Sequence, residues 1–112
     1  MEKNINDLDF AKGDGLVPVI VQDVNTKEVL TLAYANKESI LLTQKTGNSW
    51  FWSRSRNKLW MKGEESGNTQ KVREILVDCD SDAVIYLVEP AGPACHTGER
   101  VCFHNKLDQQ TL

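Results

Sequence analysis

Residues 16–35, "LVPVIVQDVNTKEVLTLAYA", carry the signal that decides the fold. The β-branched run at 17–24 and the apolar run at 29–35 each predict a strand. Between them, "NTKE" at 25–28 is rich in residues that favour turns. Two strands joined by so short a turn predict a β-hairpin, and the rest of the fold is built outward from it.

The residues that follow predict a helix over 37–46, "KESILLTQKT". Asn36 is a typical N-cap, Glu38 lies in the first turn, and Gly47 marks the end of the helix. Extended segments dominate the remainder. Strands are expected at 49–55, 59–62, 69–78 and 83–89, with loops at 63–68 and 90–99, a short closing strand at 101–105 and frayed terminal residues.

This pattern predicts an α+β fold, a small and mostly antiparallel β-sheet domain with one or two helices. The chain has 112 residues and shows no internal repeat or linker. It is therefore expected to form a single domain over 1–112, with its core at about 16–104.

Composition limits the classes of function. Hydrophobic residues make up 40% of the chain and charged residues 26%, with a net charge of −3, so bulk electrostatic binding to nucleic acid or membrane is not expected. The acidic, polar N-terminus lacks the features of a signal peptide, which predicts a cytoplasmic protein. There, its three cysteines would be reduced thiols.

The stretch "DCDSD" at 78–82 places three carboxylates within five residues. In an extended chain Asp78, Asp80 and Asp82 would share one face, and their mutual repulsion would favour a bound magnesium ion. A solvated polar turn between two strands is the alternative. An EF-hand calcium loop is excluded, because Ala83 stands where that loop needs glycine and a strand pattern follows.

The cysteines Cys79, Cys95 and Cys102 contain no C-x-x-C pair, which argues against a zinc ribbon or a thioredoxin-type site. Three thiolates match a catalytic zinc site with an open fourth position, and His96 or His104 as a fourth ligand would instead make a structural Cys₃His site. Unrelated buried thiols are the remaining alternative. On a strand Cys79 would point away from the neighbouring aspartates, so a zinc site shared between two subunits is an attractive arrangement.

A basic segment, "SRSRNKLWMKGE" at 53–64, could hold phosphate groups through its arginines, lysines and serine hydroxyls. On a strand Arg54 and Arg56 would share one face, although an exposed basic face of a hairpin is an equally simple interpretation. The tryptophans could stack on a purine, but core packing is the commoner role and is expected for at least two of Trp50, Trp52 and Trp60.

Several motifs, in this order, resemble those of the phosphoribosyl-AMP cyclohydrolase family of histidine biosynthesis. They are "VQDVNTKEVLTLAYAN" at 21–36, "TGNSWFWSRSRNKLWMKGEESGNTQ" at 46–70, "DCDSDA" at 78–83, "GPACHTG" at 92–98 and the "CF" that follows. The resemblance runs from about Leu16 to Phe103. Two positions depart from a common family pattern, since many relatives have serine where this chain has Val101 and histidine where it has Asn68.

The resemblance implies a set of roles. One magnesium per subunit would bind Asp78, Asp80 and Asp82, and one zinc per subunit would bind Cys79 of one subunit and Cys95 and Cys102 of the other, in a homodimer. His96 is the implied acid or base. The matching region gives the candidates for binding a small nucleotide substrate, namely Ser53, Arg54, Ser55, Arg56, Trp60, Lys62, Glu64 and Ser66.

The implied reaction is hydrolytic opening of the C6–N1 bond of 1-(5-phosphoribosyl)-AMP, by water activated by zinc and with magnesium assisting. The product is the formimino-aminoimidazole-carboxamide ribotide. Many bacterial relatives carry a fused domain that hydrolyses the pyrophosphate of the preceding intermediate, and none is expected within 1–112. A zinc-dependent nucleotide deaminase and a structural Cys₃His module are the alternative functions.

Overall fold

The predicted hairpin is confirmed in a computed structural model that describes residues 2–108. Strand β1 (Val17–Asp23) pairs antiparallel with β2 (Val29–Ala35), and a register shift falls between Val21 and Gln22. The carboxylate of Asp23 fixes the turn, because its Oδ1 accepts the backbone N–H groups of Asn25 at 2.8 Å and Thr26 at 3.1 Å. An aspartate at this position stabilises the turn through hydrogen bonds to the backbone, so the turn does not depend on packed side chains.

Helix α1 (Lys37–Thr46) begins and ends where the sequence predicts. The Asn36 side chain accepts the N–H of Ser39, and the Ser39 hydroxyl accepts the N–H of Asn36, which forms a reciprocal capping box. Gly47 ends the helix in the left-handed region at φ 79°, where glycine is favoured. Two short 3-10 helices, η1 (Ile5–Asp7) and η2 (Ala11–Gly13), precede the hairpin.

The remaining strands complete two sheets. They are β3 (Trp50–Ser53), β4 (Lys58–Met61), β5 (Gln70–Val77) and β6 (Val84–Pro90). The larger sheet has the order β2-β1-β6-β5, and β3 pairs with β4 in a two-stranded ribbon. The β1–β6 pair is parallel and the other strand pairs are antiparallel, so the predicted α+β fold with a mostly antiparallel sheet is confirmed.

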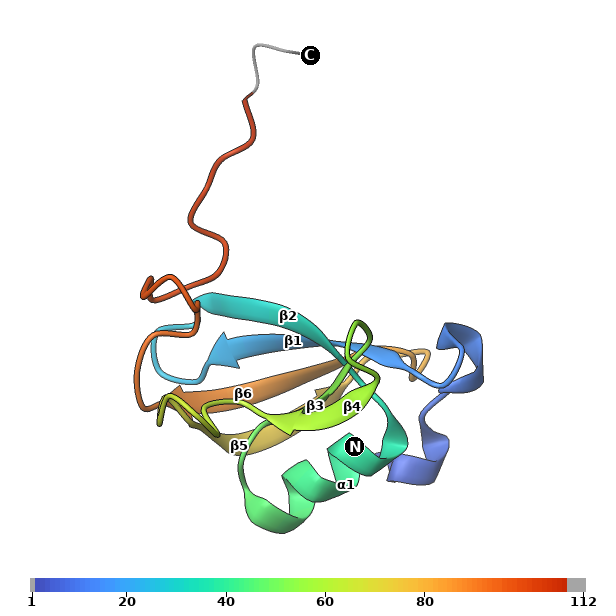
Figure 1. Ribbon diagram of the computed structural model, residues 1–112. Helices are drawn as coiled ribbons and strands as arrows, with labels where there is room; N and C mark the ends of the chain where they lie inside the picture. Colours follow the sequence, from blue (N-terminus) through green and yellow to red (C-terminus); the bar gives the residue numbers. More distant parts are fainter. Residues whose placement is uncertain (1, 109–112) are drawn as a thin grey trace.

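The core lies between the four-stranded sheet and the layer formed by α1 and the β3–β4 ribbon (Figure 1). Alternate residues of β1 and β6 point into it, and Tyr86 stacks on Phe51 with ring centroids 5.6 Å apart. Phe51 is the buried aromatic of β3, whereas Trp50 and Trp52 are only half-buried. The expectation that two tryptophans lie in the core is therefore wrong, because the alternation along β3 turns Phe51 inward.

The opposite face of the sheet carries apolar side chains that residues 2–108 cover only in part. Strand pairing places Leu32 opposite Ile20, Ile20 opposite Ile85, and Ile85 opposite Leu76, so these four side chains form a row across the sheet. Leu32 and Leu76 are 45% and 44% exposed. We call this row the open apolar face.

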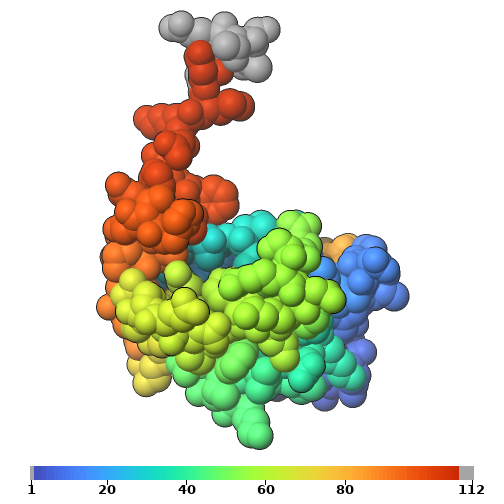
Figure 2. Space-filling model, viewed as in Figure 1, coloured from blue at the N-terminus to red at the C-terminus, as the bar shows by residue number. Residues whose placement is uncertain are grey.

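Two predicted strands differ from the structure. Strand β3 ends at Ser53, and residues 54–57 form a turn in which Asn57 has φ 54°. Residues 101–105 form no strand, and the chain beyond Cys102 extends away from the globule (Figure 2). Of the terminal residues predicted to fray, 106–108 are exposed and form no helix or strand, and 109–112 lie outside the described part of the chain. No helix within residues 2–108 is long and apolar enough to cross a membrane.

Candidate functional site

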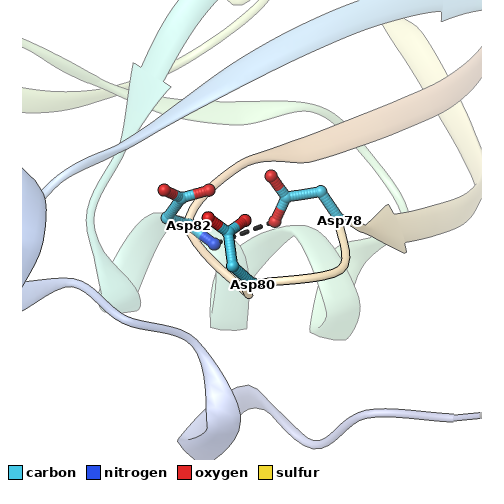
Figure 3. Close-up of side chains that lie close together, drawn as sticks. All are labelled: Asp78, Asp80 and Asp82. Atoms are coloured by element: carbon cyan, nitrogen blue, oxygen red, sulfur yellow. Dashed lines mark hydrogen bonds between the residues drawn. The ribbon is translucent and has the colours of Figure 1, made fainter.

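The three aspartates come together in the turn that joins β5 to β6. One carboxylate oxygen from each of Asp78, Asp80 and Asp82 lies within 4.8 Å of the others (Figure 3). The extended geometry predicted for them is wrong, because residues 79–82 turn, with Ser81 at φ 63°. The turn is held by Asp78, whose Oδ1 accepts the backbone N–H groups of Asp82 and Ala83. Backbone reversal, rather than strand alternation, therefore gathers the carboxylates.

Two lysines from the N-terminal segment contact this acidic turn. Lys12 Nζ lies 2.8 Å from Asp82 Oδ2 and 3.5 Å from Asp80 Oδ2. Lys3 Nζ donates to the carbonyl oxygens of Asp78 and Cys79 and to the Ser81 hydroxyl. Two ammonium groups beside three carboxylates leave one surplus negative charge at this turn.

The pKa values of the carboxylates reflect that crowding. The hydrogen bond from Lys12 lowers the pKa of Asp82 to about 2. The pKa of Asp80 is raised, first by its hydrogen bond to Asp82 and then by burial and by the neighbouring Asp78. Three carboxylate oxygens within 4.8 Å of one another are the hard donors that a divalent cation prefers, so these residues fit magnesium.

The second candidate region is the loop that follows β6, which carries Cys95 and Cys102. The Thr97 hydroxyl donates to Cys95 Sγ at 3.0 Å, and His104 Nε2 lies 3.9 Å from the same sulfur. The hydrogen bond from Thr97, with smaller contributions from His104 and Cys102, lowers the pKa of the Cys95 thiol to about 6. A thiolate at neutral pH is the form that binds zinc, so this loop fits the metal in part.

Cys79 is exposed in the acidic turn, at the other end of β6. The acidic turn and the thiol loop lie at opposite ends of β6 (Figure 1). A strand of seven residues spans about 20 Å. A single chain therefore brings Cys95 and Cys102 together but leaves Cys79 apart. The separation arises from strand length, and not from the opposite side-chain direction that the sequence suggested.

The two histidines occupy different positions relative to the thiols. His104 contacts the Cys95 sulfur from the segment beyond Cys102, whereas His96 is exposed in the loop directly after Cys95.

Of the two departures from the family pattern, Val101 is half-buried and packs against the core. Asn68 is half-buried, and its Oδ1 lies so close to Gly92 that a Cβ added to Gly92 would collide with it.

A hollow of about 500 Å³ lies beside the ribbon and gathers part of the predicted substrate set. Its lining includes Ser53, Arg54, Ser55 and Trp60, together with Ala33, Tyr34 and Trp52. The Arg54 guanidinium lies 3.8 Å over the Tyr34 ring centroid, a cation–π contact that fixes its plane. Arg54 and Arg56 occupy the 54–57 turn rather than one strand face, so that expectation is wrong.

The other predicted substrate residues do not line this hollow. Arg56 is exposed, and its backbone N–H donates to the Ser53 hydroxyl at 3.2 Å. The Lys62 N–H donates to the carbonyl of Ser49. Glu64 and Ser66 are exposed in the loop after β4, where the Ser66 hydroxyl accepts the Asn68 N–H.

Shared lining residues connect this hollow to the acidic turn. Tyr34 and Arg54 also line a second hollow, formed with Leu16 and Pro18. Leu16 and Pro18 in turn line a third hollow that reaches Asp82. Three adjoining hollows therefore lie between the cationic Arg54 and Asp82 of the carboxylate cluster.

Sequence reasoning did not find Lys3, Lys12, Tyr34 or Thr97. The lysines meet the acidic turn across about 70 intervening residues, and no local pattern reports such a contact. Tyr34 lies in β2 and was assigned only to the strand. Thr97 was detectable, because a hydroxyl two residues after a candidate metal-binding cysteine is well placed to bond its sulfur.

Together these features define a class of protein, a small α+β domain with candidate metal ligands in the loops at both ends of one sheet. The family model for phosphoribosyl-AMP cyclohydrolase matches residues 31–104. The chain is 78% identical to the phosphoribosyl-AMP cyclohydrolase of Nitrosopumilus maritimus, over 96% of its own length and 99% of that relative. It is 75% identical to the protein of the same name from Cenarchaeum symbiosum, with the same coverage.

A third relative is the histidine biosynthesis bifunctional protein HisIE of Thermus thermophilus, which is 66% identical over 83% of this chain and 44% of its own length. The chain belongs to the phosphoribosyl-AMP cyclohydrolase family, and it is a hydrolase acting on a cyclic amidine.

Proposed function

We propose that this protein opens the purine ring of 1-(5-phosphoribosyl)-AMP by hydrolysis of the C6–N1 bond, in histidine biosynthesis. The observation that carries the proposal is 78% identity, over nearly the whole chain, to a relative named phosphoribosyl-AMP cyclohydrolase. The aligned length includes the acidic turn, the thiol loop and the hollow beside Arg54. The side chains described above support this chemistry at each of these three places.

The phosphoribosyl substituent on N1 makes C6 electron-poor, so that water can add there before the C6–N1 bond breaks. The substrate presents two phosphate groups at its ends, and the protein must hold both. Arg54 offers a planar fork suited to bidentate phosphate binding, and the Tyr34 ring beneath it restrains its orientation. The Ser53 and Ser55 hydroxyls, 3.4 Å apart, add neutral hydrogen-bonding groups beside it.

Zinc, when bound, would supply Lewis acidity that makes water nucleophilic near neutral pH. Cys95 and Cys102 would hold it, and Thr97 keeps the Cys95 thiol in the deprotonated form that binds metal. Thiolates place more negative charge on a metal than imidazoles do, so the protein needs its own proton-transfer group. His96, exposed beside Cys95, is proposed for that role.

The third thiolate, Cys79, is proposed to come from a second subunit. If two sheets faced each other across a two-fold axis perpendicular to β6, the direction of β6 would be reversed in the second subunit, and the acidic turn of one subunit would lie beside the thiol loop of the other. The open apolar face supports such an assembly, because Leu32 and Leu76 are exposed and the two isoleucines between them, Ile20 and Ile85, are only half-buried. The result would be a homodimer with two equivalent zinc sites.

The acidic turn is proposed to bind magnesium, with Lys12 yielding its contact to Asp82 as the cation enters. Asp80→Asn tests this role, since it removes one negative charge and keeps the side-chain volume. We expect the magnesium concentration needed for half-maximal turnover to rise on the order of tenfold. Zinc content, measured by atomic absorption, is expected to stay unchanged.

Glu38→Gln is a matched control for that experiment, because Glu38 is an exposed carboxylate in the first turn of α1, away from the acidic turn and the open apolar face. It should leave the magnesium dependence as in the unaltered protein. Loss of zinc from Asp80→Asn would show that the two metals do not occupy separate sites.

The function itself is tested by incubating purified protein with phosphoribosyl-AMP and magnesium, and following ultraviolet absorbance as the purine ring opens. The assay is repeated after zinc is removed with a tight chelator and again after it is restored. We expect turnover to disappear on removal and to return with zinc. Ammonia in the product would favour a deaminase, and tightly bound zinc without turnover would favour a structural module.

A further inference from the structure

The thiol loop is joined to the β1–β2 hairpin by one arginine. Arg100 donates from its terminal nitrogen to Asp23 Oδ2 at 2.8 Å and from Nε to Glu28 Oε1. Asp23 is buried, with 3% of its surface exposed, whereas Glu28 is exposed at the end of the turn. One guanidinium thus bridges two carboxylates of the hairpin, an arrangement that we call the Arg100 bridge.

Backbone hydrogen bonds beside the Arg100 bridge position the two cysteines. The Arg100 carbonyl accepts the N–H of Ala94, which directly precedes Cys95. Two residues further on, the N–H of Cys102 donates to the Leu30 carbonyl at 2.7 Å. Arg100 therefore lies between the two cysteines and ties their loop to β1 and β2, in a segment that has no helix or strand of its own.

The ion pair persists at neutral pH. Burial acts to raise the pKa of Asp23, but the N–H groups of Thr26 and Asn25 and the charge of Arg100 outweigh it and lower that pKa below its ordinary value. Asp23 Oδ1 is occupied by these two N–H groups, so removal of Arg100 would leave Oδ2 of a buried carboxylate without its cation.

We propose that Arg100 is a positioning residue for the zinc site, fixing Cys95 and Cys102 relative to each other by anchoring their loop to Asp23 and Glu28. This inference rests on the proposed zinc binding by these cysteines. Groups that orient metal ligands from outside the coordination sphere commonly contribute about 10- to 100-fold to metal affinity.

Arg100→Gln in the full chain provides the test, with zinc affinity measured by competition against a chromophoric chelator. We expect the affinity to fall about 10- to 100-fold. Cobalt(II) substituted for zinc should show weaker and shifted absorption bands, because the thiolates no longer hold their geometry. Arg100→Lys keeps the charge without the planar fork and should recover only part of the affinity.

Arg73→Gln is the matched control, since it breaks the exposed pair between Arg73 and Glu89, also 2.8 Å long, on β5 and β6. Equal zinc affinities for Arg73→Gln and Arg100→Gln would overturn the inference. If Arg100→Gln fails to fold, Glu28→Gln is the second variant, because it removes only the exposed half of the bridge. It should still weaken zinc binding severalfold. Unchanged zinc binding in Glu28→Gln would overturn the inference. Unaltered protein that bound no zinc would overturn the proposed function instead.

Discussion

Mixing two inactive variants, Cys79→Ala and Cys95→Ala, is expected to restore about a quarter of the unaltered activity per chain. Each variant alone should lack turnover, because every one of its zinc sites would miss a thiolate. In a mixed dimer, one site would combine the altered Cys79 with the altered loop, and the other would combine two intact halves. Random pairing makes about half the dimers mixed, each with one of two sites restored.

The physical reason is the length of β6. Its seven residues separate Cys79 from Cys95 and Cys102 within one chain, so a site with all three thiolates needs a second chain. Zinc bound per chain should follow the same proportion as activity. The measurement is turnover and zinc content of the co-expressed mixture and then of the mixed dimer purified through its two different affinity tags, in which one of two sites is intact and activity per chain should rise to about half.

A mixture of Cys95→Ala and Cys102→Ala is the matched control. Both changes lie in the same loop, so every site in the mixed dimer retains a defect and activity should not return. Restoration in this control, or full activity of Cys79→Ala alone, would contradict the shared site. An inactive purified dimer of one Cys79→Ala chain and one Cys95→Ala chain would also contradict the shared site.

The sequence predicted the parts of the fold that depend on local signals. The β1–β2 hairpin and the capped helix after Asn36 are set by turn residues, β-branched runs and a capping side chain. The parallel pairing of β1 with β6 was not predicted, because it joins segments about 60 residues apart. The strand expected at 101–105 failed for a related reason, since its apolar residues Val101 and Phe103 suggested pairing that the loop does not make.

In the candidate site too, local features were predicted and long-range contacts were not. Asp78, Asp80 and Asp82 were predicted to converge and do so, but through a turn instead of a strand face. Lys12 and the Arg100 bridge are long-range ion pairs, and charged residues of this kind occur throughout an ordinary surface. Their partners become evident only once the strands bring them together.

The contrast between local signals and long-range contacts also explains why the sequence did not show which residues share a metal ion with Cys79. Its neighbours in sequence are the aspartates, and its proposed partners Cys95 and Cys102 lie beyond a complete strand. Local spacing therefore indicated a metal cluster without indicating which ligands share an ion. Strand length supplied the missing constraint, and it favours assembly between chains.

His96→Ala is expected to lower kcat by about 10²- to 10⁴-fold, which is the usual contribution of a positioned acid or base. Hydrolysis at C6 requires a proton to leave the attacking water and another to reach the departing nitrogen. His96 is exposed in the loop directly after Cys95, so its ring is accessible to a substrate held at the thiols. The variant should also lose one limb of its pH–rate profile while its zinc and magnesium contents stay unchanged.

His104→Ala separates this role from metal binding, because the His104 ring lies 3.9 Å from the Cys95 sulfur. Its loss removes a group that favours the Cys95 thiolate, so we expect weaker zinc binding as the primary effect. Zinc loss from His96→Ala would instead make His96 a ligand, as in a Cys₃His site. An unchanged kcat and pH profile in His96→Ala would assign proton transfer to another group. The deciding measurement is kcat at saturating zinc across the pH range for both variants.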